Sequence, residues 1–429
     1  MKKVYLVLLT LLILSSGCKE RVPGNGGENP LNEVSELSKP VSVSFLLRAV
    51  DGNDVVSPDD LGFSREHEIL KSSACILVFD AKTEQLMTWS LATVSPIDHT
   101  PDNKISSKYR VSGTLLGLRK SYFEGSDSDY SLIFTVLANP FFEMTYHDLP
   151  YDRWVEEGKT YDEVQELFSF TMTNTKHVRL FNNLQTAQGD TINPNELIPV
   201  WGSRKVSSAE LRRYAKGQDD TPGDPLALGI LRSLAKVEVS FSDHAAQMLE
   251  DGVCEIDDIR LVNCLPTGYL FPKGGKFVTD SIQKSVLMKP LTTSIEHSNP
   301  YILKDEYMHY PENTLEKIAL TFSYNPKNKR YYAYVPEQPK QNMDLSNAYI
   351  EVVVKVLNSY VSDSQYATIT YPIYFAEDAS SKDEMVAKAV PITRNAWYQF
   401  NIKDIKTTKL DATFGICPKE EYEQEYEFN

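Results

Sequence analysis

The chain of 429 residues contains few of the residues and none of the motifs on which catalysis and cofactor binding usually depend. It has 5 cysteines, 7 histidines and 4 tryptophans, and it lacks a Cys-x-x-Cys pair, a phosphate loop, a dinucleotide fingerprint, a nucleophile elbow and a His-Glu-x-x-His helix. Its 59 acidic residues outnumber 44 basic ones, and the formal net charge is −15. Because phosphate binding needs clustered basic residues, nucleic acid is excluded as a partner. We predict no enzyme activity, no metal and no cofactor.

The cysteines are too few and too scattered to form a disulfide framework. Cys254 and Cys264 lie ten residues apart in a segment that we expect to be extended, which would keep their thiols apart. Spacing alone does not predict a pairing among Cys75, Cys254, Cys264 and Cys417, so a disulfide stays open. We expect buried free thiols.

Long apolar runs are scarce, and the run at the N-terminus is short. Two lysines precede an apolar stretch at residues 4–14, which is well below the roughly 20 residues that span a bilayer. Small residues then lead to Cys18, an order that is typical of a secretory signal. The junction resembles a bacterial lipoprotein signal, so we predict a signal peptide at residues 1–18 with Cys18 as the acylated residue. A plain secreted precursor is the alternative.

Strand-forming residues dominate the rest of the chain, which has 24 tyrosines and 18 phenylalanines. Residues 19–40 are rich in Gly, Pro, Asn and Glu, and we predict a disordered tether there. The first strand follows, with an apolar residue at every second position up to Arg48: Val41, Val43, Phe45 and Leu47. Later strands are expected at 74–79, 85–89, 109–115, 131–137, 234–241, 256–262, 317–324, 331–335, 349–356, 366–371 and 397–402.

Helices are expected at residues 161–168 and 207–214, the second with Ser207 and Glu210 spaced as a capping box. A polar cluster rich in Pro, Gly and Asp at residues 217–225 is the clearest domain boundary. We therefore predict a mostly β protein with two tandem β-sandwich domains, at residues 41–218 and 225–410, and short helical insertions.

The C-terminus has a strict two-residue alternation. Its odd positions from 421 to 427 are glutamates, and its even positions are Tyr422, Gln424, Tyr426 and Phe428. One face of such a strand is suited to burial and the other to water. Because terminal residues fray unless they are held, this strand either completes its own domain or pairs with another sheet. Ala412, Phe414 and Ile416 alternate likewise, so we assign residues 411–429 to an extended tail.

Several segments together resemble one family, the fimbrillin-type fimbrial subunits of Bacteroidales, which are made as lipoprotein precursors. The resemblance rests on the lipoprotein cysteine and tether, on the first strand ending at Arg48, and on the order of six further segments. These segments are residues 75–80 (CILVFD), 136–140 (VLANP), 198–202 (IPVWG), 231–239 (LRSLAKVEV), 310–313 (YPEN) and 392–398 (ITRNAWY).

The resemblance implies two transthyretin-like, Ig-like β-sandwich domains and polymerisation by donor-strand exchange. An arginine-specific protease would cut between Arg48 and Ala49, although Arg65 is a competing site. The cut would remove the first strand, with Val41, Val43, Phe45 and Leu47, and release the subunit from its lipid anchor. The vacated groove would accept the donor strand of another fimbrial subunit, with Tyr422, Gln424, Tyr426 and Phe428 facing it.

The resemblance therefore predicts an outer-membrane lipid-anchored precursor that becomes part of a cell-surface fimbrium and mediates adhesion. Its partners would be other fimbrial subunits, including anchor subunits, and the protease. The alternatives are a lipidated fimbrial anchor, a tip adhesin, or a surface lipoprotein that binds glycans or proteins.

Overall fold

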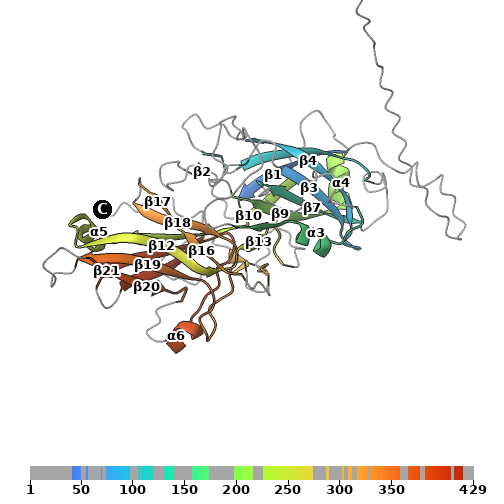
Figure 1. Ribbon diagram of the computed structural model, residues 1–429. Helices are drawn as coiled ribbons and strands as arrows, with labels where there is room; N and C mark the ends of the chain where they lie inside the picture. Colours follow the sequence, from blue (N-terminus) through green and yellow to red (C-terminus); the bar gives the residue numbers. More distant parts are fainter. Residues whose placement is uncertain are drawn as a thin grey trace, which may run out of the picture.

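The structure of the protein is a computed structural model (Figure 1). It describes residues 41–49, 55–56, 69, 74–96, 105–106, 108–118, 130–139, 157–172, 198–215, 226–273, 287–288, 302–303, 308–311, 316–326, 329–357, 366–376, 382–406 and 410–418. The predicted mostly β fold with short helical insertions is confirmed. Cys18, Arg65 and the residues from 419 onward lie outside the described ranges.

The first half of the chain forms a closed seven-stranded barrel (Figure 1). Around the ring, the order of the strands is β1-β10-β9-β7-β3-β4-β6. Their bounds are β1 Val41–Ala49, β3 Ala74–Asp80, β4 Leu86–Pro96, β6 Lys108–Leu115, β7 Ser131–Ala138, β9 Val200–Ser207 and β10 Leu226–Arg232. The β1–β10 contact is parallel, and the other neighbours in the ring are antiparallel.

Strand β3 is buried on both of its faces, as its continuous apolar sequence indicates. Ile76 and Val78 belong to the apolar cluster inside the barrel, whereas Leu77 and Phe79 belong to a second cluster on the outer side. Helix α3 (Tyr161–Leu167) covers that outer side, and the Tyr161 ring lies 4.6 Å from the Phe79 ring. The barrel wall is therefore the boundary between two apolar cores.

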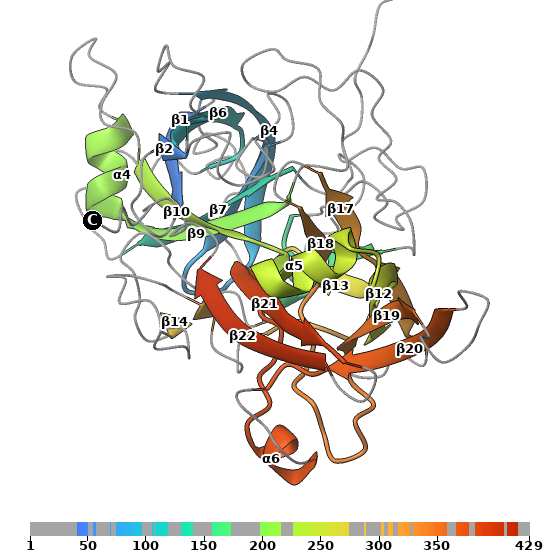
Figure 2. The same ribbon diagram turned by 90° about the vertical axis from the view of Figure 1, so that its left-hand side faces the viewer.

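The second half of the chain forms two sheets that pack face to face (Figure 2). The five-stranded sheet has the order β17-β18-β11-β21-β22, with bounds Ser323–Asn325, Arg330–Val335, Ala235–Phe241, Ala396–Ile405 and Leu410–Pro418. The four-stranded sheet has the order β16-β12-β19-β20, with bounds Ile318–Thr321, Cys254–Cys264, Tyr349–Leu357 and Tyr366–Ile373. We call this half the sandwich.

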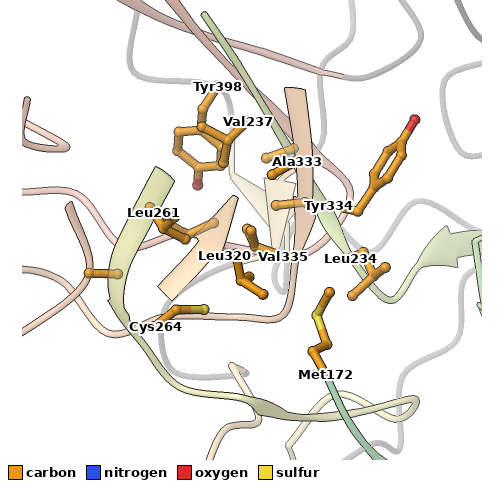
Figure 3. Packing of buried hydrophobic residues seen from close by; sticks show 14 of the residues in the cluster. Met172, Leu234, Val237, Leu261, Cys264, Leu320, Ala333, Tyr334, Val335 and Tyr398 are labelled. Carbon is orange, nitrogen blue, oxygen red and sulfur yellow. The ribbon is translucent and has the colours of Figure 1, made fainter. Parts of the chain in front are cut away.

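The sandwich core is continuous with the outer core of the barrel. Val237, Leu261, Leu320 and Val335 pack between the two sheets, and Met172 approaches Leu234 beside them (Figure 3). Short ladders complete the described structure: β2 (Val55–Val56) with β5 (Ile105–Ser106), β8 (Ser169–Thr171) with β13 (Thr267–Tyr269), and β14 (Leu287–Met288) with β15 (Ile302–Leu303). The β8–β13 ladder joins the two halves through hydrogen bonds.

The predicted helices are present as α3 and as α4 (Ser208–Ala215). Their caps follow the sequence: Glu163 accepts a hydrogen bond from the amide of Thr160, and Glu210 accepts one from the amide of Ser207. Helix α5 (Asp243–Glu250) was not predicted, although Ser242 caps it, and helix α6 spans Lys382–Ala387. Among the described helices, none has the length and apolarity needed to cross a bilayer.

Two predicted segment boundaries differ from the observed pairing. Residues 226–232, assigned to the second domain, form β10 of the barrel because β1 and β9 lie on either side of it. Residues 411–418, assigned to the tail, lie in β22, which pairs with β21 at the edge of the sandwich. For β10 the deciding partner β1 is distant in sequence, whereas for β22 it is β21, the strand that directly precedes it. The domain boundaries themselves stay a prediction.

The predicted state of three cysteines is confirmed. Cys75, Cys254 and Cys264 are free and buried, and the last two begin and end the single strand β12. Burial raises the pKa of the Cys75 thiol to about 12, which makes the thiol unreactive at neutral pH. The side chain of Cys417 lies outside the described structure.

Candidate functional site

Strand β1 occupies the place in the barrel ring between β6 and β10 (Figure 2). It runs antiparallel to β6, from Val41 opposite Leu115 to Arg48 opposite Lys108. It runs parallel to β10, from Phe45 opposite Leu226 to Ala49 opposite Ile230. The removal of β1 would leave an open sheet of six strands with β6 and β10 as its two new edges.

The positions of the predicted apolar face of β1 stand opposite buried positions of β6. Residues directly opposite each other in a sheet lie on the same face. The β6 positions opposite the face are buried, with exposed fractions of 0% for Leu115, 0% for Val111 and 1% for Tyr109. In register, Val41, Val43, Phe45 and Leu47 stand opposite Leu115, Gly113, Val111 and Tyr109.

The predicted cleavage site lies at the C-terminal end of β1. Arg48 is paired on both sides, with Lys108 of β6 and Gly229 of β10, and Ala49 is paired with Ile230. The Arg48–Ala49 peptide bond is therefore part of the barrel wall. The last residues of β1 have to separate from both neighbours before a protease can bind them.

The two neighbours of β1, strands β6 and β10, differ in how much pairing they have with other strands. Strand β6 pairs on its other side with β4 from Tyr109 to Gly113, so most of its length stays in an antiparallel ladder without β1. Strand β10 pairs with β9 at Leu231 and Arg232, its last two residues. Parallel pairing is also slightly weaker per residue than antiparallel pairing. The β1–β10 pairing is thus weaker than the β1–β6 pairing.

The predicted donor strand follows an edge strand of the sandwich. Strand β22 pairs with β21 from Ala396 opposite Pro418 to Ile405 opposite Leu410. Only three residues separate Pro418 from Tyr422 in the sequence. Tyr422, Gln424, Tyr426 and Phe428 lie outside the described residues, as does Cys18.

The segments that carry the family resemblance meet at the junction between the barrel and the sandwich. The Nδ2 atom of Asn139 donates to the carbonyl oxygen of Ile198 (3.1 Å), and the amide of Ser233 donates to that of Pro199 (2.8 Å). The hydroxyl of Ser233 donates to the carbonyl oxygen of Leu270 (3.1 Å). The link from β10 to β11 is therefore buried and fixed by hydrogen bonds on both sides.

Arg394 is the centre of this junction. Its guanidinium and the Glu337 carboxylate are both 1% exposed, and they form a two-point ion pair with Nε–Oε1 and Nη2–Oε2 distances of 2.9 Å. Its nitrogens also donate to the carbonyl oxygens of Tyr269, Leu270 and Phe271 (3.0, 2.6 and 3.2 Å). A buried charge is tolerated when it is paired and hydrogen-bonded in this way.

His309 connects the junction to helix α3. Its Nδ1 atom lies 3.0 Å from the carbonyl oxygen of Phe271, and its Nε2 atom lies 3.0 Å from Oε1 of Glu166. Its ring stacks on Tyr269 at 3.6 Å. Burial is the main cause that lowers the pKa of His309, and the positive charge of Arg394 adds to it. The hydrogen bond to the Phe271 carbonyl and the carboxylates of Glu166 and Glu337 act in the opposite direction. A neutral imidazole can donate to only one of its two acceptors.

Sequence reasoning identified most of these segments but not their meeting. Arg394 and Asn395 lie in one family-like segment, and Arg232 and Ser233 lie in another. Glu337 and His309 carried no recognised signal, because a single acidic residue or histidine in a strand-rich chain has no distinctive spacing. Within the described ranges, no group of three or more His, Cys, Asp and Glu residues is placed to hold a metal ion.

The sequence matches no protein-family model and no curated protein. Solved structures similar to the chain include the tip fimbrial protein Mfa3 from Porphyromonas gingivalis (13% identity, TM-score 0.42, 88% of this chain and 100% of that chain covered). A fimbrial assembly protein from Parabacteroides distasonis is similar at 11% identity and a TM-score of 0.40, with coverages of 88% and 95%.

The fimbrial anchor protein Mfa2 from Porphyromonas gingivalis is similar at 8% identity and a TM-score of 0.29, with coverages of 88% and 98%. These neighbours are fimbrial proteins of Bacteroidales, the group to which the sequence resemblance pointed. With TM-scores below 0.5, the similarity does not assign a function to this chain.

Proposed function

We propose that the chain is a structural subunit of a cell-surface fimbrium that is assembled by donor-strand exchange. In this proposal the chain is made as a lipoprotein acylated at Cys18 and reaches the outer membrane. An arginine-specific protease then cuts after Arg48, and the tail of another subunit replaces β1. The assembled fimbrium mediates adhesion.

The position of β1 in the barrel ring supports this proposal most strongly. Strand β1, the first described element, is one continuous segment that fills the place between β6 and β10. Its loss would expose two rows of unpaired backbone amides and carbonyls beside an apolar interior. Such an edge is a template for the strand of another chain. A cut after Arg48 would also separate the rest of the chain from Cys18.

The two exchangeable strands have matching sequence patterns. The even positions from Tyr422 to Phe428 form a mostly aromatic face with a period of two, as the odd positions from Val41 to Leu47 form an apolar face. Both faces suit the same interior, whereas the glutamates of the tail would face solvent. In this proposal the tail, which begins just after β22, extends to the barrel of another subunit.

Substitution of the proposed cleavage site tests the assembly route. We expect Arg48→Ala to trap a full-length, membrane-bound precursor and to abolish the high-molecular-weight ladder of polymers seen by electrophoresis of cell-surface material. Arg65→Ala is the matched control and should polymerise normally. Undiminished polymer in Arg48→Ala would contradict cleavage after Arg48. Loss of polymer only in Arg65→Ala would show that the protease cuts after Arg65 instead.

The intact mass of the mature chain from the cell surface separates the main proposal from its alternative. A chain that begins at Ala49 without lipid fits a polymerising subunit. A lipidated chain that begins at Cys18 fits an anchor subunit or a surface binding lipoprotein and would contradict a role in the fimbrial shaft.

A further inference from the structure

Strand β10 is divided between two neighbours along its length. Its first five residues, from Leu226 to Ile230, pair with β1, and its last two residues pair with β9. Its middle also packs directly on Gly202 of β9, where a side chain would collide with the carbonyl oxygen of Gly229. When β1 leaves, most of the ladder pairing of β10 leaves with it.

The C-terminal end of β10 is held by the sandwich. The side-chain oxygen Oδ1 of Asn395 accepts a hydrogen bond from the backbone amide of Arg232 at 3.2 Å and lies 3.5 Å from its Nη1 atom. The backbone amide of Asn395 donates to the carbonyl oxygen of Leu234 at 3.1 Å. Asn395 and Arg232 are 8% and 5% exposed, so water competes little for these bonds. One asparagine thus binds the link both before and after Ser233.

The backbone of Asn395 explains why this residue type suits the position. Its φ angle is +60°, in the left-handed region that asparagine tolerates better than most residues with a side chain. Glycine would also adopt this angle but would lack the acceptor oxygen. Aspartate would keep an acceptor oxygen. Backbone conformation and hydrogen bonding can therefore be separated by substitution.

We propose that Asn395 is a positioning residue for strand exchange, which holds the end of β10 and keeps the groove in shape when β1 is absent. The inference rests on the proposed function. Without this contact, the end of β10 would keep its short pairing with β9 and the bonds of Ser233 to Pro199 and Leu270, but its last amide would lose the acceptor from the sandwich. An inserted strand would then have a less firmly held parallel neighbour. The contact therefore slows the departure of any strand from the groove.

The exchange rate of β1 tests the inference directly. A recognition sequence for a site-specific protease is inserted after Ala49 in the full chain, and the chain is cut in vitro. A fluorescent peptide with the sequence of residues 41–49 is then added in excess, and its incorporation is followed by anisotropy. Loss of a buried hydrogen bond should make Asn395→Gly exchange about tenfold faster than the parent. Asn395→Asp should restore a rate near that of the parent.

The matched control is Asn263→Gly. Asn263 also has a positive φ angle, +57°, and lies in β12 of the sandwich, which does not pair with β10. Its substitution should leave the exchange rate unchanged. Equal rates in Asn395→Gly and the parent, including no exchange in either, would overturn the inference.

Hydrogen exchange separates positioning from a general loss of stability. In the cut Asn395→Gly protein we expect faster amide exchange in residues 226–232 and unchanged exchange in Ala74–Asp80. Faster exchange in both segments would indicate global destabilisation and overturn the inference. If peptide exchange behaves as expected but the cell-surface chain never polymerises, the proposed function fails while the role of Asn395 in retaining β1 stands.

Discussion

Single polar residues hold the two halves of the molecule together in places that water does not reach. The ion pair of Arg394 with Glu337 is satisfied by two hydrogen bonds between the partners and by three backbone carbonyl oxygens. Such a pair adds little net stability compared with apolar packing, but it is costly to break. Its main effect is to require one relative arrangement of the segments that it joins.

The pH dependence of stability should depend on His309. Because its folded-state pKa lies below the ordinary value of 6.5, the unfolded chain binds a proton more readily at this site. The stability that the neutral His309 imidazole contributes is therefore complete above pH 6.5. It is lost as the pH falls from 6.5 toward the folded-state pKa of His309. We expect His309→Gln to reduce the decline in urea midpoint between about pH 7 and pH 5.

The groups around His309 define the control for this measurement. Four residues face its ring: Glu166, Glu337, Arg394 and Tyr269. A folded-state pKa that is lower by one corresponds to about 1.4 kcal/mol of unfolding free energy. His244 lies at the surface, 3.6 Å from Asp404, with its side chain 69% exposed. His244→Gln should keep the parent pH profile. A profile of His309→Gln that matches the parent would show that another group causes the acid destabilisation.

At the scale of elements, the proposed exchange depends on how many neighbours each strand has. Strand β1 has neighbours on both sides and closes the ring, whereas β22 has one neighbour, β21, in the described sheet. Removal of β1 from the closed ring would create two new edge strands, β6 and β10. Removal of β22 would only make β21 the edge strand of its sheet. In the proposed exchange β1 and β22 would therefore have different roles, β1 as the strand that is replaced and β22 as the support for the donor.

Two truncations test the division between β22 and the tail. Deletion of residues 422–429 removes no described element, so we expect a folded monomer that melts within about 2 °C of the parent and does not polymerise after cleavage. Deletion of residues 410–429 also removes β22 and uncovers β21, and we expect this chain to aggregate or fail to fold. Circular-dichroism melting measures both. Unfolding of the shorter deletion would mean that the tail completes its own domain.

At the scale of the whole molecule, one apolar cluster extends from the barrel wall through the junction into the sandwich. Its members include Phe79 and Trp201 from the barrel and Val335 and Tyr398 from the sandwich. The Phe271 ring lies 5.5 Å from Tyr161 of α3 and so packs against the barrel side. The two halves therefore share buried surface as parts of one domain do, and we expect them to unfold together.

Substitution of Arg394 tests this cooperativity. Arg394→Met leaves Glu337 as an uncompensated buried charge, and we expect a loss of about 3–5 kcal/mol of unfolding free energy. Because the lost contacts cross the junction, we expect one calorimetric transition in the parent and two in Arg394→Met.

The double variant Arg394→Met/Glu337→Met removes both charges and should recover part of the stability, although the carbonyl oxygens of residues 269–271 lose the guanidinium donors. A single unshifted transition in Arg394→Met would show that apolar packing alone couples the halves.

Local sequence predicted the elements well where the signal was periodic. The alternation from Val41 to Leu47 gave β1, and the apolar run from Ala74 to Phe79 gave β3. Ser207 and Glu210 gave the start of α4. Local sequence did not predict β9 and β10, because glycines and a short polar stretch interrupt their apolar patterns. Pairing of β9 with β7 and of β10 with β1 overrides local preference there.

The sequence by itself determined the strand-rich composition, the leader pattern before Cys18, the apolar faces of the first strand and the tail, and the segments that resemble fimbrial subunits. These properties depend on side-chain type and on spacing of two to four residues. Only the tertiary structure decided that β1 lies between β6 and β10, that β10 belongs to the barrel, and that Asn395 and Arg394 bind the junction. The Arg232–Asn395 bond, for example, joins residues 163 positions apart, and such pairs leave no periodic trace in one sequence.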